Sequence, residues 1–139
     1  MPQNEPVIKV TLVPEAKRLD AADQHFGIRF PMIFEPMVYR FSEQLAETYT
    51  GGYWHFYKLS NGGFYMAPNL EDSFAVLADN GYTGTISADA LGITACLYTY
   101  SQLSFSEDAF GQSCTKQYHL LYAFAMEHPE AKAIRAAID

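Results

Sequence analysis

The sequence predicts an α+β protein in which helices come before and after a run of antiparallel strands. Residues 50–68 contain two aromatic segments joined by SNGG at 60–63, which is the pattern of a β-hairpin with a glycine-rich turn. A second hairpin signal, DNG at 79–81, lies between two further strand-like segments. Segments with helical periodicity flank these strands rather than alternate with them, so a parallel βαβ arrangement fits poorly.

The N-terminal residues differ in character from the rest of the chain. We expect residues 1–12 to form a mobile arm and residues 13–139 to form a single domain, since 139 residues suffice to bury a core. The first residues carry prolines and no apolar pattern. Residues 7–13 fit either a short strand or an ordered arm.

Two helices are expected between this arm and the hairpin, and each begins near a proline. Pro14 fits the first helical position, where its missing N–H is no loss, and Gly27 should end that helix. Pro36 opens a second helix with an apolar stripe, which Gly51 and Gly52 should end.

The first strand of the hairpin is aromatic on both faces. A period of two puts Tyr53, His55 and Tyr57 on one face. Trp54 and Phe56 then lie on the other. Such a strand is either covered on both sides or has one face exposed for use. We expect the covered arrangement, because large exposed apolar patches are uncommon on monomers.

Two strands and three helices are expected after the hairpin. The strands are residues 74–78 and 82–86, so four consecutive strands with short links make one antiparallel meander. Ser87 is placed as the N-cap of the first of these helices. A long helix follows over about residues 109–127, and Pro129 opens a last short helix.

The charge of the chain disfavours direct binding to nucleic acid. Sixteen acidic and nine basic residues give a formal net charge of −7, which repels a phosphate backbone. The carboxylates are dispersed and charged residues make up only 18% of the chain. Imitation of DNA by an acidic surface therefore stays as the less favoured alternative.

We expect no catalytic site, no metal site and no cofactor. Cys114 and His119 are five residues apart on one predicted helix, which turns their side chains away from each other. The histidines lack the i, i+4 pairs or clustered spacing of a zinc site. Cys96 and Cys114 have apolar neighbours and are expected to be buried thiols of a cytoplasmic protein. A hydrolase site that folding assembles from distant residues stays as a second alternative.

Four segments are distinctive: HFGIRF at 25–30, GGYWHFYKLSNGGFYMAP at 51–68, ISADALGI at 86–93 and HPEAKAIRAAID at 128–139. They closely resemble the ArdB/KlcA family of antirestriction proteins, and the resemblance covers nearly everything from about Leu12 to Asp139. It implies a non-enzymatic protein of plasmids and other mobile elements. Such a protein relieves type I restriction of unmodified DNA while sparing modification. The family is set apart from the strongly acidic DNA mimics and offers no settled active site to transfer.

The resemblance and the dispersed charge together imply inhibition through protein–protein contact. The expected partner is the type I restriction-modification complex or an associated host protein. We expect no direct contact with nucleic acid, membrane or a small-molecule substrate. The candidate contact residues are Tyr53, Trp54, His55, Tyr57 and Asn61 of the hairpin and Asp139 at the chain end.

Overall fold

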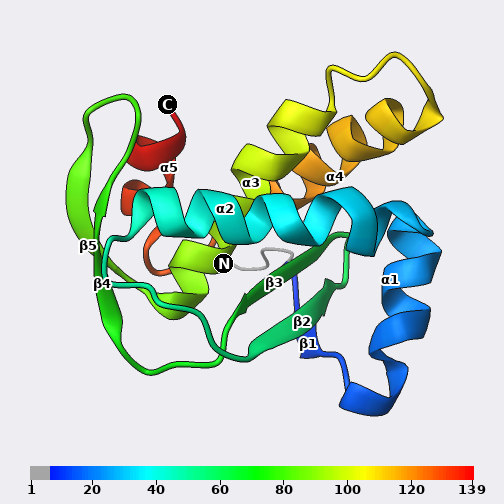
Figure 1. Ribbon diagram of the computed structural model, residues 1–139, viewed down its shortest axis with the longest axis horizontal. Helices are drawn as coiled ribbons and strands as arrows, with labels where there is room; N and C mark the ends of the chain where they lie inside the picture. Colours follow the sequence, from blue (N-terminus) through cyan, green and yellow to red (C-terminus); the bar gives the residue numbers. More distant parts are fainter. Residues whose placement is uncertain (1–6) are drawn as a thin grey trace, which may run out of the picture.

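The computed structural model describes residues 7–139, apart from the side chain of His25, and shows helices packed around two small antiparallel sheets (Figure 1). The predicted α+β class is confirmed. The strands are β1 (Val10–Leu12), β2 (Trp54–Leu59), β3 (Phe64–Pro68), β4 (Ser73–Leu77) and β5 (Thr83–Ser87). The helices are η1 (Glu15–Lys17), α1 (Arg18–Phe26), the π-helical turn η2 (Phe30–Phe34), α2 (Glu35–Leu45), α3 (Ala88–Leu103), α4 (Ala109–Ala125) and α5 (Ala131–Ile138).

The four strands of the predicted meander lie in two sheets, and this corrects the prediction of a single one. The first sheet has the order β1-β2-β3 and the second has the order β4-β5. Within the hairpin, Tyr57 lies opposite Tyr65. β3 and β4 do not pair, because α3 occupies the edge of β3 at which a fourth strand would have to lie.

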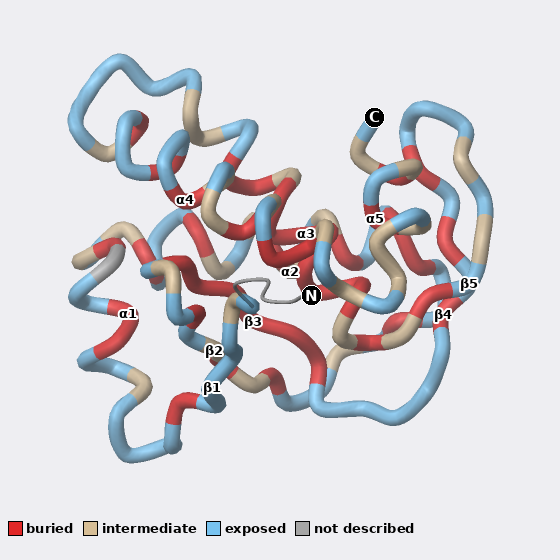
Figure 2. The backbone as a smooth tube through the Cα atoms, turned by 180° about the vertical axis from the view of Figure 1, so that it is seen from behind, coloured by how far each residue is buried: buried red, intermediate tan, exposed pale blue. Residues whose placement is uncertain are grey.

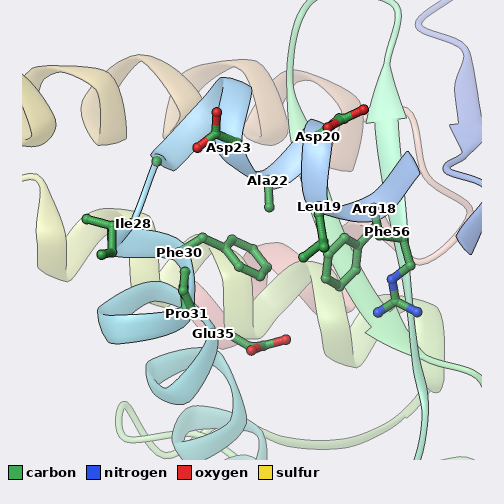
Figure 3. A pocket seen from close by; sticks show the side chains of 11 residues that line it. Arg18, Leu19, Asp20, Ala22, Asp23, Ile28, Phe30, Pro31, Glu35 and Phe56 are labelled. Atoms are coloured by element: carbon green, nitrogen blue, oxygen red, sulfur yellow. The ribbon is translucent and has the colours of Figure 1, made fainter. Parts of the chain in front are cut away.

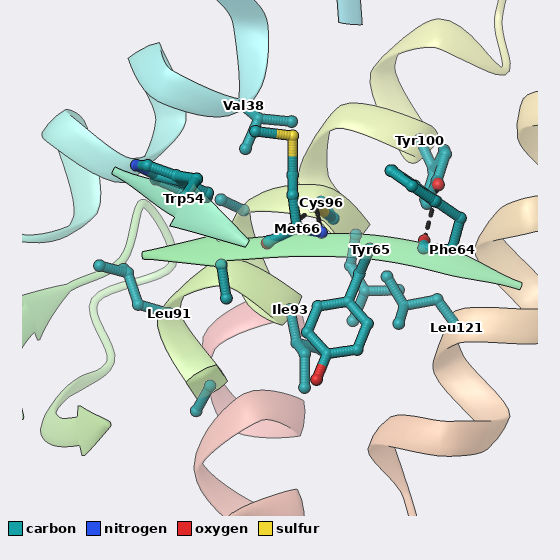
Figure 4. Close-up of a cluster of buried hydrophobic side chains, with 14 of the residues drawn as sticks. Val38, Trp54, Phe64, Tyr65, Met66, Leu91, Ile93, Cys96, Tyr100 and Leu121 are labelled. Atoms are coloured by element: carbon teal, nitrogen blue, oxygen red, sulfur yellow. Dashed lines mark hydrogen bonds between the residues drawn. The ribbon is translucent and has the colours of Figure 1, made fainter. Parts of the chain in front are cut away.

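Side chains of α3 close this edge of β3 (Figure 4). The Tyr100 hydroxyl donates a hydrogen bond to the Phe64 carbonyl at 2.8 Å. The Met66 N–H donates to the Cys96 sulfur at 3.5 Å, and the thiol lies 3.6 Å from the Met66 carbonyl oxygen. An open strand edge is a template for pairing with other chains, so α3 both satisfies and protects it.

The helix can lie this close to the strand because Gly92 has no side chain. A Cβ atom at that position would lie 2.4 Å from both the Met66 carbonyl oxygen and the Ala67 Cβ atom. Glycine lowers the stability of a helix interior, so its presence here is explained by packing rather than by helix propensity. α3 contacts both sheets, α2, α4 and α5, and Figure 2 shows it buried along most of its length.

An aromatic cluster fills the space between the first sheet and the N-terminal helices. Phe26 of α1 stacks on Phe34 of η2 with ring centroids 4.5 Å apart, and Phe34 lies 5.0 Å from Tyr100 of α3. Phe30 meets the sheet through an edge contact with Phe56 at 5.2 Å. These rings join α1, η2 and α3 to one face of the hairpin.

The end of α2 and the first described residues bear on two of the predicted boundaries. α2 ends at Leu45, not at Gly51 as predicted, because Ala46 is extended and Tyr49 turns back to accept a hydrogen bond from the Trp54 indole at 2.8 Å. Residues 1–6 of the expected arm lie outside the described residues. The residues that follow include β1, which pairs with β2. Whether residues 1–12 are mobile stays a prediction.

The variant Gly92→Ala tests the close approach of α3 to β3. The added methyl group overlaps backbone and side-chain atoms of β3, and we expect it to lower the free energy of unfolding by about 3 kcal/mol. Urea unfolding followed by circular dichroism measures this. The variant Ser101→Thr adds a methyl group at an exposed site on the same helix and should change stability by less than about 0.5 kcal/mol. Equal stability of the two variants would contradict the packing argument.

Candidate functional site

The outer face of β2 carries a row of aromatic side chains. The His55 ring makes edge contacts with Tyr53 at 5.6 Å and with Tyr57 at 6.1 Å between centroids. Tyr53 is 47% exposed, and His55 and Tyr57 are half-buried. The strand is therefore fully covered on one face only, which corrects the expectation of cover on both faces.

Trp54 points to the covered face and is only 2% exposed. It packs edge-on against Tyr39 at 5.2 Å and against Tyr49 at 5.9 Å, and it donates its indole N–H to Tyr49. A partner cannot reach this side chain in the folded protein. Trp54 is thus a core residue, and the accessible candidates of the strand are Tyr53, His55 and Tyr57.

The aromatic row continues inward to a partly buried hydrogen-bond network. Tyr57 stacks on Tyr65 of β3 at 4.8 Å. The Tyr65 hydroxyl donates to one oxygen of Asp89 at 2.8 Å, and His128 Nε2 lies 2.9 Å from the other oxygen. The Glu130 N–H donates to His128 Nδ1 at 3.0 Å, so the ring proton is on Nε2 and points at Asp89. Both ring nitrogens are engaged, which leaves neither free to act as a base.

Ser87 and Glu130 also join the segment at the start of α3 to the segment before α5. Glu130 accepts from the Ser87 N–H at 2.9 Å and from the Ser87 hydroxyl. The Ser87 oxygen in turn accepts from the Ala90 N–H at 3.1 Å, which confirms Ser87 as the N-cap of α3. The start of α5 is thereby tied to the start of α3.

Burial sets the protonation of the phenols in this region. Burial raises the pKa of Tyr65 well above its ordinary value, and the neighbouring Asp89 carboxylate raises it further. The same two causes, in the same order, raise the pKa of Tyr57. Both hydroxyls therefore remain protonated at neutral pH, and that of Tyr65 serves as a hydrogen-bond donor.

The sequence did not reveal this network, because its members are distant along the chain. Tyr65 and Asp89 are 24 residues apart, and Asp89 and His128 are 39 apart. The one available signal was that these residues belong to three of the distinctive segments, 51–68, 86–93 and 128–139. No spacing rule predicts that Asp89 would join the other two.

Asn61 holds the hairpin turn in place. Its side-chain N–H donates to the Leu120 carbonyl at 2.9 Å, and its oxygen accepts from the Gly63 N–H at 2.9 Å. The Gly62 carbonyl accepts from the side chain of Gln117 at 3.2 Å. Asn61 is therefore engaged in fixing the turn against α4.

Asp139 lies apart from the hairpin, beside the β4–β5 turn (Figure 1). It lines a cleft of about 240 Å³ together with Asp79, Asn80 and Tyr98. Its side chain is exposed and lies 3.7 Å from the Arg135 guanidinium. The structure thus places the sequence-predicted contact residues on two separate surfaces.

Both cysteines have free thiols that are buried in the core. Burial raises the pKa of Cys96 to about 12 and that of Cys114 to about 11, so both thiols are protonated at neutral pH. Among the side chains that the structure describes, no group of three or more His, Cys, Asp or Glu residues could hold a metal ion. None of the described helices is long and apolar enough to cross a membrane.

The fold and the aromatic row can now be compared with those of known proteins. The chain belongs to the antirestriction protein family, whose model matches residues 47–139. The resemblance seen in the distinctive segments is thereby confirmed.

Relatives in this family extend over the whole chain. An antirestriction protein KlcA of Escherichia coli is 45% identical over 99% of this chain and 98% of its own length. A second Escherichia coli KlcA is 43% identical over 95% of this chain and 94% of its own length. A solved structure from work on the KlcA and ArdB proteins is 43% identical in sequence and superposes with a TM-score of 0.90. The match covers 100% of this chain and 100% of the solved chain. Those proteins show a novel fold and antirestriction activity against type I DNA restriction systems in vivo but not in vitro.

The variant Asp89→Ala tests the hydrogen-bond network of Tyr65, Asp89 and His128. It leaves the Tyr65 hydroxyl, on a residue that is 1% exposed, without its acceptor, and we expect a loss of about 2 kcal/mol in the free energy of unfolding. Urea unfolding measures this loss. In the Tyr65→Phe background the same substitution should cost less, because no orphaned hydroxyl remains. Equal losses of stability in the two backgrounds would contradict a hydrogen bond from the Tyr65 hydroxyl to Asp89.

The raised pKa values of the thiols predict how stability changes in alkaline solution. The unfolded thiol titrates near its ordinary value of 9.0, whereas folded Cys96 and Cys114 titrate at about 12 and about 11. The unfolded chain thus loses these protons first as the pH rises. The thiols should therefore contribute stability fully below pH 9.0 and progressively less above it.

Urea unfolding at neutral pH and above pH 9.0 measures this dependence, and the Cys96→Ala/Cys114→Ala variant should show a shallower decline. Ellman's reagent should label the thiols only after unfolding. Rapid labelling of the native protein at neutral pH would show that the thiols are neither buried nor protonated.

Proposed function

We propose that this protein relieves type I restriction of unmodified DNA and leaves modification intact, through contact with a protein rather than through catalysis. The observation that carries the proposal is the family membership combined with a full-length likeness to proteins that have this activity in vivo. The partner is the type I restriction-modification complex or an associated host protein. The site of action is the cytoplasm of a bacterium that receives a plasmid or other mobile element.

The activity of the related proteins in vivo but not in vitro supports a mechanism that needs a cellular component. An inhibitor that occupied the DNA-binding groove of the restriction enzyme would act on the purified enzyme as well. Contact with a component that the cell supplies explains the difference between the two settings. The dependence on that component argues against simple DNA mimicry.

The outer face of β2 is the surface that best suits such contact. Binding energy at protein interfaces is concentrated in a few aromatic and charged anchors, and Tyr53, His55 and Tyr57 form such a group on β2 and just before it. Tyr57 stacks on Tyr65 and the Tyr53 hydroxyl accepts a hydrogen bond from Arg18, so little side-chain freedom is lost on binding. Asp139, on its separate surface, is kept as a second candidate contact.

DNA mimicry is retained as the second candidate because the net charge is −7. A mimic would inhibit less as the salt concentration rises, since its carboxylates are exposed to screening. Protein contact through aromatic side chains depends much less on salt. Binding of this protein to the type I restriction-modification complex, measured at two salt concentrations, separates these two mechanisms.

Plating of unmodified phage tests the proposal directly. On bacteria with a type I restriction system, expression of this protein should raise the plating efficiency, and the surviving phage should carry modified DNA. The variant Tyr53→Ala/His55→Ala removes two anchors and should reduce the relief by about tenfold or more.

The matched control is Phe105→Ala, which removes an exposed aromatic ring from the α3–α4 loop and should leave the relief unchanged. Thermal unfolding establishes that each variant is folded. Full relief by the folded double variant would reject this surface, and no relief by the unaltered protein would reject the function.

A further inference from the structure

A cleft of about 600 Å³ lies between α1 and η2 on the side of the molecule that carries the distinctive segment 25–30 (Figure 3). Its lining includes the buried rings of Phe30 and Phe56 and the side chains of Leu19 and Ile28. Leu19 is 86% exposed and Ile28 is 76% exposed. Phe30 and Phe56 also belong to the aromatic cluster, so the cleft is an opening onto the core.

The apolar exposure extends beyond the lining of the cleft. Met32 and Ile33, on the adjoining turn η2, are also exposed. Exposed apolar residues that occur singly need no explanation, but a contiguous group of them marks an interaction site. Leu19 and Ile28 line the same cleft, and Met32 and Ile33 lie on the turn that forms its wall, so the exposed apolar residues gather on this part of the chain.

The charges around the cleft are unequal. Among the described residues that line it, three carry carboxylates, Asp20, Asp23 and Glu35, and one carries a guanidinium, Arg18. The guanidinium of Arg18 is already engaged: it lies 4.0 Å above the Phe56 ring and binds the Tyr53 hydroxyl. The surroundings are therefore negative, and an apolar segment with basic neighbours matches both the cleft and its rim.

The backbone that forms one wall of the cleft is irregular. η2 is a π-helical turn in which the Glu35 N–H donates to the Phe30 carbonyl, and Pro31 lies within it. π-helical turns occur frequently at functional sites. Gly27, with a φ of 59°, makes the sharp reversal between α1 and η2 that opens the cleft. Local backbone features thus shape this wall of the cleft.

We propose that this cleft, called here the α1–η2 cleft, binds one segment of the partner protein: the apolar face of a helix that carries lysine or arginine on its flanks. The proposal rests on the proposed function and names a chemistry for its partner. Arg18 touches both Tyr53 and Phe56, so it links the cleft to the near end of the aromatic row. A second copy of this chain is disfavoured as the occupant, because each copy has a formal charge of −7.

The first test uses three synthetic helical peptides as probes of the full chain. One has a leucine face with lysine flanks, the second has the same face with glutamate flanks, and the third has serine in place of leucine. Isothermal titration should show binding of the leucine–lysine peptide and at least about tenfold weaker binding of the other two. Nuclear magnetic resonance shifts should be concentrated at Leu19 and Ile28.

Substitutions locate the binding on the protein. The variant Leu19→Ser/Ile28→Ser should weaken binding of the leucine–lysine peptide by about tenfold or more, as should Asp23→Asn/Glu35→Gln. The matched controls are Leu77→Ser and Asp72→Asn, which remove an exposed leucine and an exposed carboxylate elsewhere and should change nothing. Equal binding of the lysine and glutamate peptides, or equal weakening by the controls, overturns the proposal.

Two further measurements distinguish a failure of the cleft proposal from a failure of the proposed function. If sedimentation shows a dimer that Leu19→Ser/Ile28→Ser disrupts, a second copy occupies the cleft and the proposal is rejected. If the same folded variant relieves restriction as well as the unaltered protein does, the cleft has no part in antirestriction, while the proposed function stands. If the unaltered protein gives no relief, the proposed function fails whatever the peptides do.

Discussion

The close contact between α3 and the edge of β3 is the constraint on which the rest of the fold depends. It needs Gly92, because a side chain there would overlap Met66 and Ala67. It also needs Cys96 and Tyr100, which supply polar partners for backbone groups of the strand. With its edge occupied by a helix, the hairpin cannot grow into a larger sheet, and β4 and β5 must pair with each other elsewhere.

The class of fold was predictable from local patterns because each element carries its own signal. The glycine-rich turns, the aromatic strand and the Ser87 cap act within a few residues, and the predicted hairpins and helix order follow from them. The division into two sheets was not predictable. It depends on an edge contact between β3 and α3, and strand periodicity says nothing about what covers an edge.

The candidate site was predictable only in part for the same reason. The alternation of β2 put Tyr53, His55 and Tyr57 on one face, which the structure shows as a row of ring contacts. It could not tell that this face, and not that of Trp54, would be the accessible one. The bonds among Tyr65, Asp89 and His128 join three segments, and no pattern within one segment indicates them.

The distinctive segments serve two physical purposes, and this bears on where a partner can bind. Most of their large side chains, among them Phe30, Phe64 and Tyr65, are buried and hold the fold together. A partner meets only the few that reach the surface, such as Tyr53 of the hairpin and Ile28 of the segment before η2. Arg18 joins these two regions through its contacts with Tyr53 and Phe56. A substitution among the buried majority should therefore act chiefly on the fold, whereas a substitution among the exposed minority can change binding and leave the fold intact.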